Sequence, residues 1–306
     1  THMTLFDGLT SRTIETPRLV VGILERAGDD ATASADQTVI LVHTALSANL
    51  TWQELMQDLP SDLRVVALDL RGFGGSESLP VDPSRGVRDF SDDLRATLLE
   101  LGIDSAHLVG WGLGAAVALQ YALDFPVRSL TLESGIGSAF IVDPDFLERL
   151  TSGDVSTDAP TSPRSVFRSG FVAEGYTSEH EDVWIDAMRS TSTAEGNYPG
   201  GVLEALASFD ASGVVAIEPK PPILWIHGTA DTLLPELDIT RTREVLNAYA
   251  AAGGEVHELA LDGVGHTPHL ERPAQFRRAL LQIMGYLGRP QNPAPPTEAI
   301  VIPSSD

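Results

Sequence analysis

The chain has 306 residues, 42% of them hydrophobic and 21% charged, which is ordinary for a globular protein of one large domain with an insertion, or of two small domains. Its formal net charge of −23 repels phosphate backbones and anionic lipids, so we expect no nucleic-acid or membrane partner. The lack of cysteine excludes disulfides and thiolate chemistry, and the 8 histidines show no metal-ligand spacing, so we expect no metal.

No apolar run reaches the length of about 18 residues that identifies a membrane-spanning helix. The first residues, Thr1 to Met3, resemble the remnant of an expression tag, and no charged segment with an apolar run follows them. We therefore expect a cytoplasmic protein without a secretion signal. Nothing in the sequence indicates an oligomeric state.

Two kinds of segment alternate along most of the chain: apolar runs bounded by turn residues, and segments with helical spacing. In chain order the pattern predicts a hairpin at 13–27, strands at 39–44, 64–70, 106–111, 128–133, 222–227 and 255–261, and helices at 51–59, 87–101, 113–123, 240–252 and 272–287. Strands that are separated by helices and apolar along their length predict an α/β fold, with a mostly parallel sheet and helices on both faces.

Residues 137–215 break this alternation. They are rich in Ser, Thr, Pro, Gly and Asp, yet they hold more aromatic residues than a disordered linker would. We interpret them as a helical lid inserted between two parts of one core, residues 1–136 and 216–288. The Pro-rich residues 289–306 are expected to form a surface tail.

The strand at 106–111 leads through residues 110–114 (Gly-Trp-Gly-Leu-Gly) into a helix of small residues. Glycine at these positions suits a tight turn between a strand and a closely packed helix. A glycine-rich turn also binds dinucleotides, but there it follows the first strand, with an acidic residue about twenty positions later. Here the turn follows the third long strand, so we expect no dinucleotide cofactor.

Five motifs occur in an order that resembles the α/β-hydrolase superfamily, in particular its lidded carboxylesterases and lactonases. They are residues 43–45 (His-Thr-Ala), 69–76, 110–114, 226–235 and 263–273. The resemblance covers about residues 13–288 and implies the α/β-hydrolase fold.

The resemblance also implies a role for each motif. Gly112 stands at the centre of the nucleophile elbow, in the position of the nucleophile itself. Asp231 takes the place of the triad acid and His266 that of the base. The backbone N–H groups of Ala45 and Leu113 would form the oxyanion hole.

The residues expected to line the substrate pocket are apolar: Leu46, Trp111, Phe140, Phe167 and Trp184. They suggest a small-molecule substrate with an apolar acyl group or a ring. Thr44 stands where the family has a glycine, and His269 is interpreted as structural rather than as a second base. No cofactor is expected.

Glycine at position 112 supplies no hydroxyl, so this chain cannot form an acyl-enzyme there. We favour the interpretation that glycine has replaced the serine of a hydrolase that acts on an ester, lactone or related acyl bond. Two alternatives stay open: a natural ligand-binding member, and a lyase, cyclase or oxygenase that needs only His266 and Asp231. An aspartate nucleophile in the parent enzyme is open as well.

Overall fold

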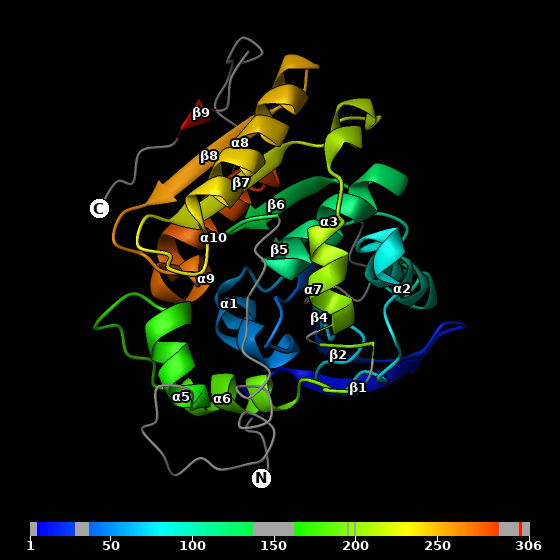
Figure 1. Ribbon diagram of the computed structural model, residues 1–306, viewed down its shortest axis with the longest axis vertical. Coiled ribbons are helices and arrows are strands. Elements are labelled where there is room, and N and C mark those ends of the chain that lie inside the picture. The colour runs from blue at the N-terminus through cyan, green and yellow to red at the C-terminus, as the bar shows by residue number, and fades with distance from the viewer. Residues whose placement is uncertain are drawn as a thin grey trace.

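The computed structural model describes residues 5–27, 37–136, 162–194, 196–198 and 200–287, together with the backbone of 300–301. These residues form a nine-stranded sheet with the strand order β1-β2-β4-β3-β5-β6-β7-β8-β9 (Figure 1). The pairs β1–β2 and β2–β4 are antiparallel, and every other pair of neighbours is parallel. The expected hairpin therefore forms the antiparallel edge of a mostly parallel sheet.

The strands are β1 (Thr10–Glu15), β2 (Val20–Arg26), β3 (Thr38–Val42), β4 (Arg64–Leu68), β5 (His107–Trp111), β6 (Ser129–Glu133), β7 (Ile223–Gly228), β8 (Val256–Leu261) and β9 (Ile300–Val301). The α-helices are α1 (Gln53–Asp58), α2 (Arg88–Glu100), α3 (Leu113–Asp124), α5 (Pro163–Val166), α6 (Glu181–Arg189), α7 (Gly200–Ala207), α8 (Glu236–Ala251), α9 (Pro268–Glu271) and α10 (Pro273–Ile283). Shorter helical turns are η2 (Asn49–Trp52), η3 (Pro83–Arg85), η4 (Phe167–Phe171) and η5 (Ser212–Ala216).

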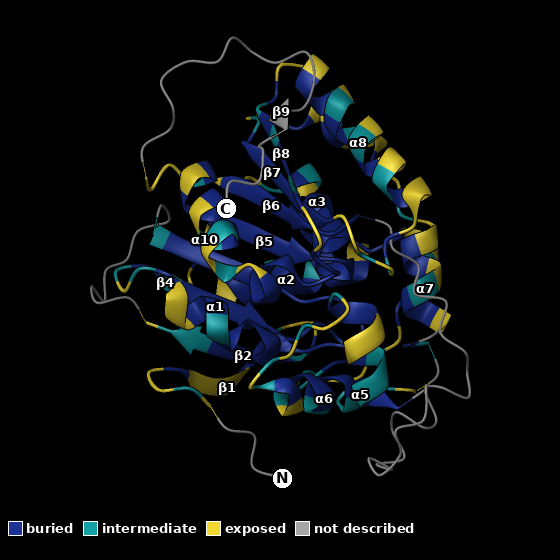
Figure 2. Ribbon diagram, turned by 90° about the vertical axis from the view of Figure 1, so that its left-hand side faces the viewer, coloured by how far each residue is buried: buried dark blue, intermediate teal, exposed yellow. Residues whose placement is uncertain are grey.

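Helices cover both faces of the sheet, as the sequence predicts. α1 and α10 pack together on one face, whereas α2 and α3 pack together on the other. The central strands β3, β5, β6 and β7 are buried along their whole length (Figure 2), which explains why β3 and most of β5 and β7 are apolar.

Three predicted helices have different ends in the structure. The helix predicted at 272–287 is α10, which begins at Pro273 and ends at Ile283; a short helix that was not predicted, α9, precedes it, and Arg272, with φ −136° before a proline, separates the two. α8 begins at Glu236, directly after the extended Pro235, rather than at residue 240. The helix predicted at 51–59 begins as the tighter turn η2 and becomes α1 at Gln53.

The Pro-rich tail contains an element that the sequence did not predict. Residues Ile300 and Val301 form β9, which pairs in parallel with His257 and Glu258 of β8. The outer edge of β8 offers unpaired backbone N–H and C=O groups, and β9 satisfies some of them. Part of the expected surface tail is thus a strand of the sheet.

The described part of the predicted lid comprises α5, η4, α6, α7 and η5. α5 and α6 lie side by side at one end of the molecule (Figures 1 and 2). This part contacts loops at the carboxyl ends of parallel strands: Thr232 donates to the Ser169 carbonyl, and the Thr267 hydroxyl lies 3.2 Å from that of Phe171. Its function as a lid stays a prediction.

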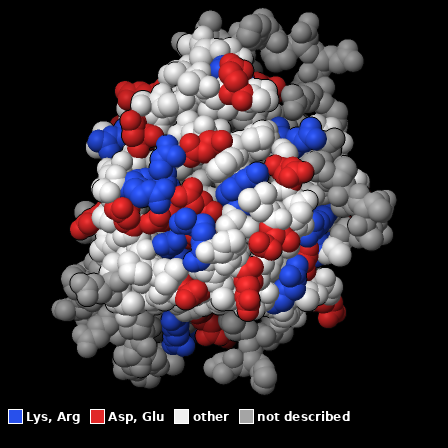
Figure 3. Space-filling view, turned by 90° about the vertical axis from the view of Figure 1, so that its right-hand side faces the viewer, with Lys and Arg blue, Asp and Glu red and all other residues white. Residues whose placement is uncertain are grey.

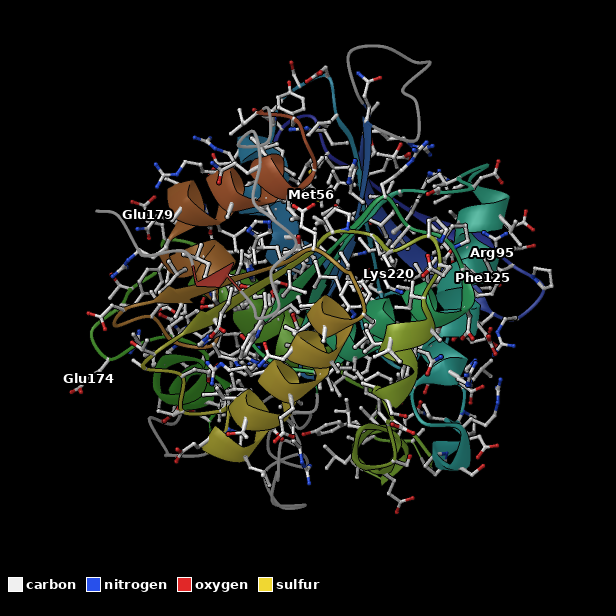
Figure 4. The ribbon with its side chains drawn as sticks, turned by 90° about the horizontal axis from the view of Figure 1, so that it is seen from above. Met56, Arg95, Phe125, Glu174, Glu179 and Lys220 are labelled. Carbon is white, nitrogen blue, oxygen red and sulfur yellow. The ribbon has the colours of Figure 1, made fainter. Side chains whose placement is uncertain are left out.

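Two α2 side chains connect this helix to α3 and to the chain just after it. Arg95 lies over the ring of Phe125, with 4.9 Å between its guanidinium carbon and the ring centroid (Figure 4). Arg88 forms an ion pair with Asp124 at 2.7 Å.

Acidic and basic side chains are interspersed over the face that Figure 3 shows, despite the large negative net charge. Within the described ranges, no helix is long and apolar enough to cross a lipid bilayer.

Candidate active site

The turn between β5 and α3 is held by its glycines. Gly112 adopts φ +55°, a conformation that favours glycine, and its N–H donates to the Glu133 carbonyl at 3.0 Å. A β-carbon on Gly110 would overlap the carbonyl oxygen of Gly114, and one on Gly114 would overlap that of Val42. The sequence therefore forms a sharp turn with the helix start pressed against β3 and β5.

His266 and Asp231 come together from the loops after β8 and β7. Nδ1 of His266 lies 2.8 Å from Oδ2 of Asp231, and both side chains are buried. The N–H groups of Leu233 and Leu234 donate to Oδ1 of Asp231 at 2.8 and 3.1 Å. A carboxylate accepts hydrogen bonds only, so Nδ1 carries a proton, and in the neutral imidazole the lone pair is on Nε2.

The Nε2 atom of His266 lies beside the elbow. A β-carbon on Gly112 would be 3.5 Å from it. A nucleophile on a side chain at position 112 would therefore project next to the base, which is the geometry that nucleophilic catalysis needs. The structure thus brings Gly112, His266 and Asp231, the three residues that the sequence assigned to a triad, into one place.

The backbone of His266 is clamped by two side chains. Trp111 Nε1 and Ser134 Oγ both donate to its carbonyl oxygen, at 2.7 and 2.9 Å. On the other side of the loop, Glu271 accepts from the N–H of Gly265 and the hydroxyl of Thr267, each at 3.0 Å. These bonds hold the backbone on both sides of His266, and the bond between its Nδ1 and Asp231 orients the ring.

The loop after β3 is held by His43. Its Nε2 accepts from the Leu70 N–H at 3.0 Å, so its Nδ1 carries the proton and donates to the Thr44 carbonyl at 2.6 Å. Burial lowers the pKa of His43 to about 4. Leu46, which the sequence assigned to the pocket, is buried and adopts φ +57°, a conformation rarely seen in leucine.

The two residues assigned to the oxyanion hole have different surroundings. The N–H of Leu113 donates to Oγ1 of Thr44 at 3.2 Å, so this N–H is already engaged in a hydrogen bond within the protein. Ala45 is buried beside it in the loop. The oxyanion-hole assignment stays a prediction.

Aromatic side chains gather around His266. Trp111 contacts Phe171, Trp184 and the His266 ring, with centroids 5.6 to 5.7 Å apart. Phe167 packs against Trp184 at 5.4 Å. Three of the predicted pocket residues, Trp111, Phe167 and Trp184, therefore belong to one cluster. Phe140 lies outside the described residues.

The sequence interpretation missed Trp52, Phe171 and Glu133. Trp52 lies 4.3 Å from the ring of His269, and Trp184 stacks on that ring at 5.7 Å. Nδ1 of His269 bonds to the buried Glu133 carboxylate at 2.7 Å. The one available signal for Glu133 was its place at the end of a parallel strand, where polar residues often serve a site.

A metal site does not appear in the part of the chain that the structure describes: no three His, Cys, Asp or Glu side chains there could hold an ion together. The ion pairs and hydrogen bonds reported above explain the arrangement of His266 and Asp231 without one.

Comparison with known proteins identifies the family of this chain. A model of the alpha/beta hydrolase family matches residues 39–279. A pimeloyl-[acyl-carrier protein] methyl ester esterase of Aeromonas salmonicida is 25% identical over 260 residues, 81% of this chain and 95% of that protein. A 2-hydroxy-6-oxononadienedioate/2-hydroxy-6-oxononatrienedioate hydrolase of Paraburkholderia phymatum is 26% identical over 271 residues, 83% and 89% of the two chains.

Among solved structures, one of a putative aryl esterase from Burkholderia cenocepacia superposes with a TM-score of 0.67, at 23% identity, over 89% of this chain and 96% of that one. This similarity shows the fold. Because the family model spans most of the chain, from the first central strand to α10, the chain belongs to the alpha/beta hydrolase family.

Proposed function

We propose that this chain binds a small molecule with an ester, lactone or related acyl group beside Gly112, under the aromatic cluster of Trp111, Phe167 and Trp184. The observation that carries the proposal is the place of His266: its Nε2 faces the elbow, and Asp231 holds its Nδ1 at 2.8 Å. Aromatic walls with one positioned polar group are typical of sites for apolar small molecules.

In a parent enzyme with serine at position 112, the chemistry would follow from this arrangement. The serine hydroxyl would attack the carbonyl carbon while His266 takes its proton, and Asp231 would stabilise the imidazolium that forms. His266 would then return the proton to the leaving group. A relative whose name is methyl ester esterase supports an acyl substrate of this kind.

The present chain lacks that hydroxyl, and we propose that it is inactive in acyl transfer. Removing the nucleophile of a serine protease lowers turnover by about 10⁶-fold. His266 retains a lone pair with which it could activate water, so any remaining hydrolysis would be slow and would depend on His266.

A second candidate is a natural member that binds its ligand without hydrolysis, or a lyase, cyclase or oxygenase that uses only His266 and Asp231. One observation favours it: Thr44 has its hydroxyl where the side chain of a nucleophile at position 112 would lie. Because Thr44 fills the space beside Gly112, the site is more consistent with a natural glycine at position 112 than with a serine that was replaced by glycine.

The test measures binding and turnover with aryl esters and aryl lactones, in the unmodified chain and in His266→Ala. We expect saturable binding to the unmodified chain, no burst of product, and at most a slow steady rate that His266→Ala removes. Fast His266-dependent turnover without a burst would support the second candidate. No binding of any of these compounds would contradict the proposed site.

A further inference from the structure

We propose that Thr44 fills the nucleophile position that Gly112 leaves open and closes the oxyanion hole, so that the two residues are a matched pair that excludes a serine nucleophile. This inference rests on the proposed binding site beside Gly112, and it favours the second candidate, a natural glycine, over the replacement of a serine. It predicts that serine at position 112 does not by itself restore a serine hydrolase.

The first argument is steric. A β-carbon on Gly112 would overlap Oγ1 of Thr44 and lie 2.9 Å from Cβ of Thr44. Rotation of the Thr44 side chain would move its hydroxyl away. It would leave Cβ in place, however, because Cβ is fixed by the backbone. A serine at position 112 therefore needs a shift of the Thr44 backbone as well as a new rotamer.

The second argument is that this backbone is held. His43 Nδ1 donates to the Thr44 carbonyl at 2.6 Å, and His43 is anchored in turn by the Leu70 N–H. On the other side, the start of α3 cannot retreat along β3 freely, since Gly114 already lies against the Val42 carbonyl. Close-packed interiors resist such displacements, and relieving the overlap would cost stability.

The third argument concerns hydrogen bonding. Oγ1 of Thr44 accepts the hydrogen bond of the Leu113 N–H at 3.2 Å, and this N–H is the donor that the family resemblance assigns to the oxyanion hole. A hydroxyl that accepts one bond still has one proton to donate. The carbonyl oxygen of a ligand would thus accept a hydrogen bond from the hydroxyl of Thr44 instead of from the Leu113 N–H, and the two donors lie at different positions. Loss of one oxyanion donor lowers kcat by about 10² to 10³-fold in a serine protease.

The experiment uses a fluorophosphonate probe, which reacts with activated serine and does not require the natural substrate. The variants are Gly112→Ser, Gly112→Ser with Thr44→Gly, and Gly112→Ser with Thr44→Val. Valine keeps the shape of threonine without its hydroxyl, so the third variant is the matched control. Mass spectrometry of the labelled peptides identifies the modified residue.

We expect the Thr44→Gly double variant to be labelled at position 112 about 100-fold faster than either of the other two. Labelling of Gly112→Ser alone at the same rate would overturn the proposal. Labelling of Thr44 in the unmodified chain would overturn it too, because Thr44 would then be a nucleophile. Failed ligand binding would contradict the proposed function but not this inference, since the probe reports only on the pair.

A second measurement covers the case in which the serine variants do not fold. Gly112→Ala adds only the β-carbon, and its effect on the thermal midpoint is compared in the Thr44 and Thr44→Gly backgrounds. We expect a much larger loss of thermal stability with Thr44 present, because the overlap exists only there. Equal losses in the two backgrounds would overturn the steric argument.

Discussion

Glu133 accepts two hydrogen bonds from His269, one from the ring Nδ1 at 2.7 Å and one from the backbone N–H at 2.8 Å. His269 lies three residues after His266, so the carboxylate at the end of β6 anchors the segment that carries His266. Glu133 therefore acts as a positioning residue, through His269.

Glu133→Gln replaces one carboxylate oxygen by an NH₂ group that cannot accept a hydrogen bond. We expect the free energy of unfolding in urea to fall by about 1–3 kcal/mol, because the NH₂ group takes the place of Oε2, 2.9 Å from Nδ1 of His269, where two buried donors then face each other. Glu100→Gln, at the exposed end of α2, is the control and should change it by less than about 0.5 kcal/mol. Equal effects of the two variants would show that Glu133 anchors nothing.

Asp231 is expected to act only through His266. In the variant that carries both Gly112→Ser and Thr44→Gly, we expect Asp231→Asn to lower kcat for an aryl ester by about 10⁴-fold, because the tautomer of His266 is no longer fixed. Asp262→Asn, at an exposed carboxylate that binds Thr229, should leave kcat unchanged. A comparable loss in both variants would argue against a specific role for Asp231.

Asp69 is buried beneath the same loops, where it accepts from the N–H groups of Asn49 and Gly75 at 2.7 and 2.8 Å. Burial raises its pKa from 3.8 to about 7. Between these two pH values the folded protein binds a proton that the unfolded chain releases. The stability contributed by Asp69 is therefore full below pH 4 and is lost as the pH rises to about 7.

Asp69→Asn removes this titration. The free energy by which the unmodified chain exceeds the variant should shrink by about 4 kcal/mol as the pH rises from about 4 to 7. Urea denaturation of both proteins at several pH values measures the difference and cancels all other titrating groups. A difference that stays constant with pH would contradict the raised pKa.

Arg71 and Asp93 form a buried ion pair with two parallel bonds, 2.6 and 2.8 Å long. We expect Asp93→Asn to lower the free energy of unfolding by about 3–5 kcal/mol with little dependence on salt, since it removes the closest carboxylate of the buried Arg71, which keeps only Asp89 at 3.8 Å, and also breaks the pair of Asp93 with Arg18. Asp124→Asn breaks the more exposed pair with Arg88 and should cost at most about 1 kcal/mol. If salt reduced both losses alike, the Arg71 pair would not be buried in solution.

Much of the fold could be predicted because its signals are local in the chain. The apolar run at 39–44 favours a strand and the glycines at 110–114 favour a tight turn, whatever distant residues do. These two segments therefore predicted β3 and the elbow. Helix ends were less predictable. The break between α9 and α10 at Arg272 has a local cause, the proline that follows it. The strand β9, in contrast, forms only because β8 has an open edge.

The amino-acid sequence alone shows that position 112 carries no side chain and that Asp231 and His266 follow it in the order of the family. The surroundings of the glycine, in contrast, depend on how the chain folds. Thr44 lies 68 positions away in the chain, and its contact with Gly112 arises because β3 and β5 are neighbours in the sheet. No local pattern reveals such a contact, since strand order depends on the packing of the whole core.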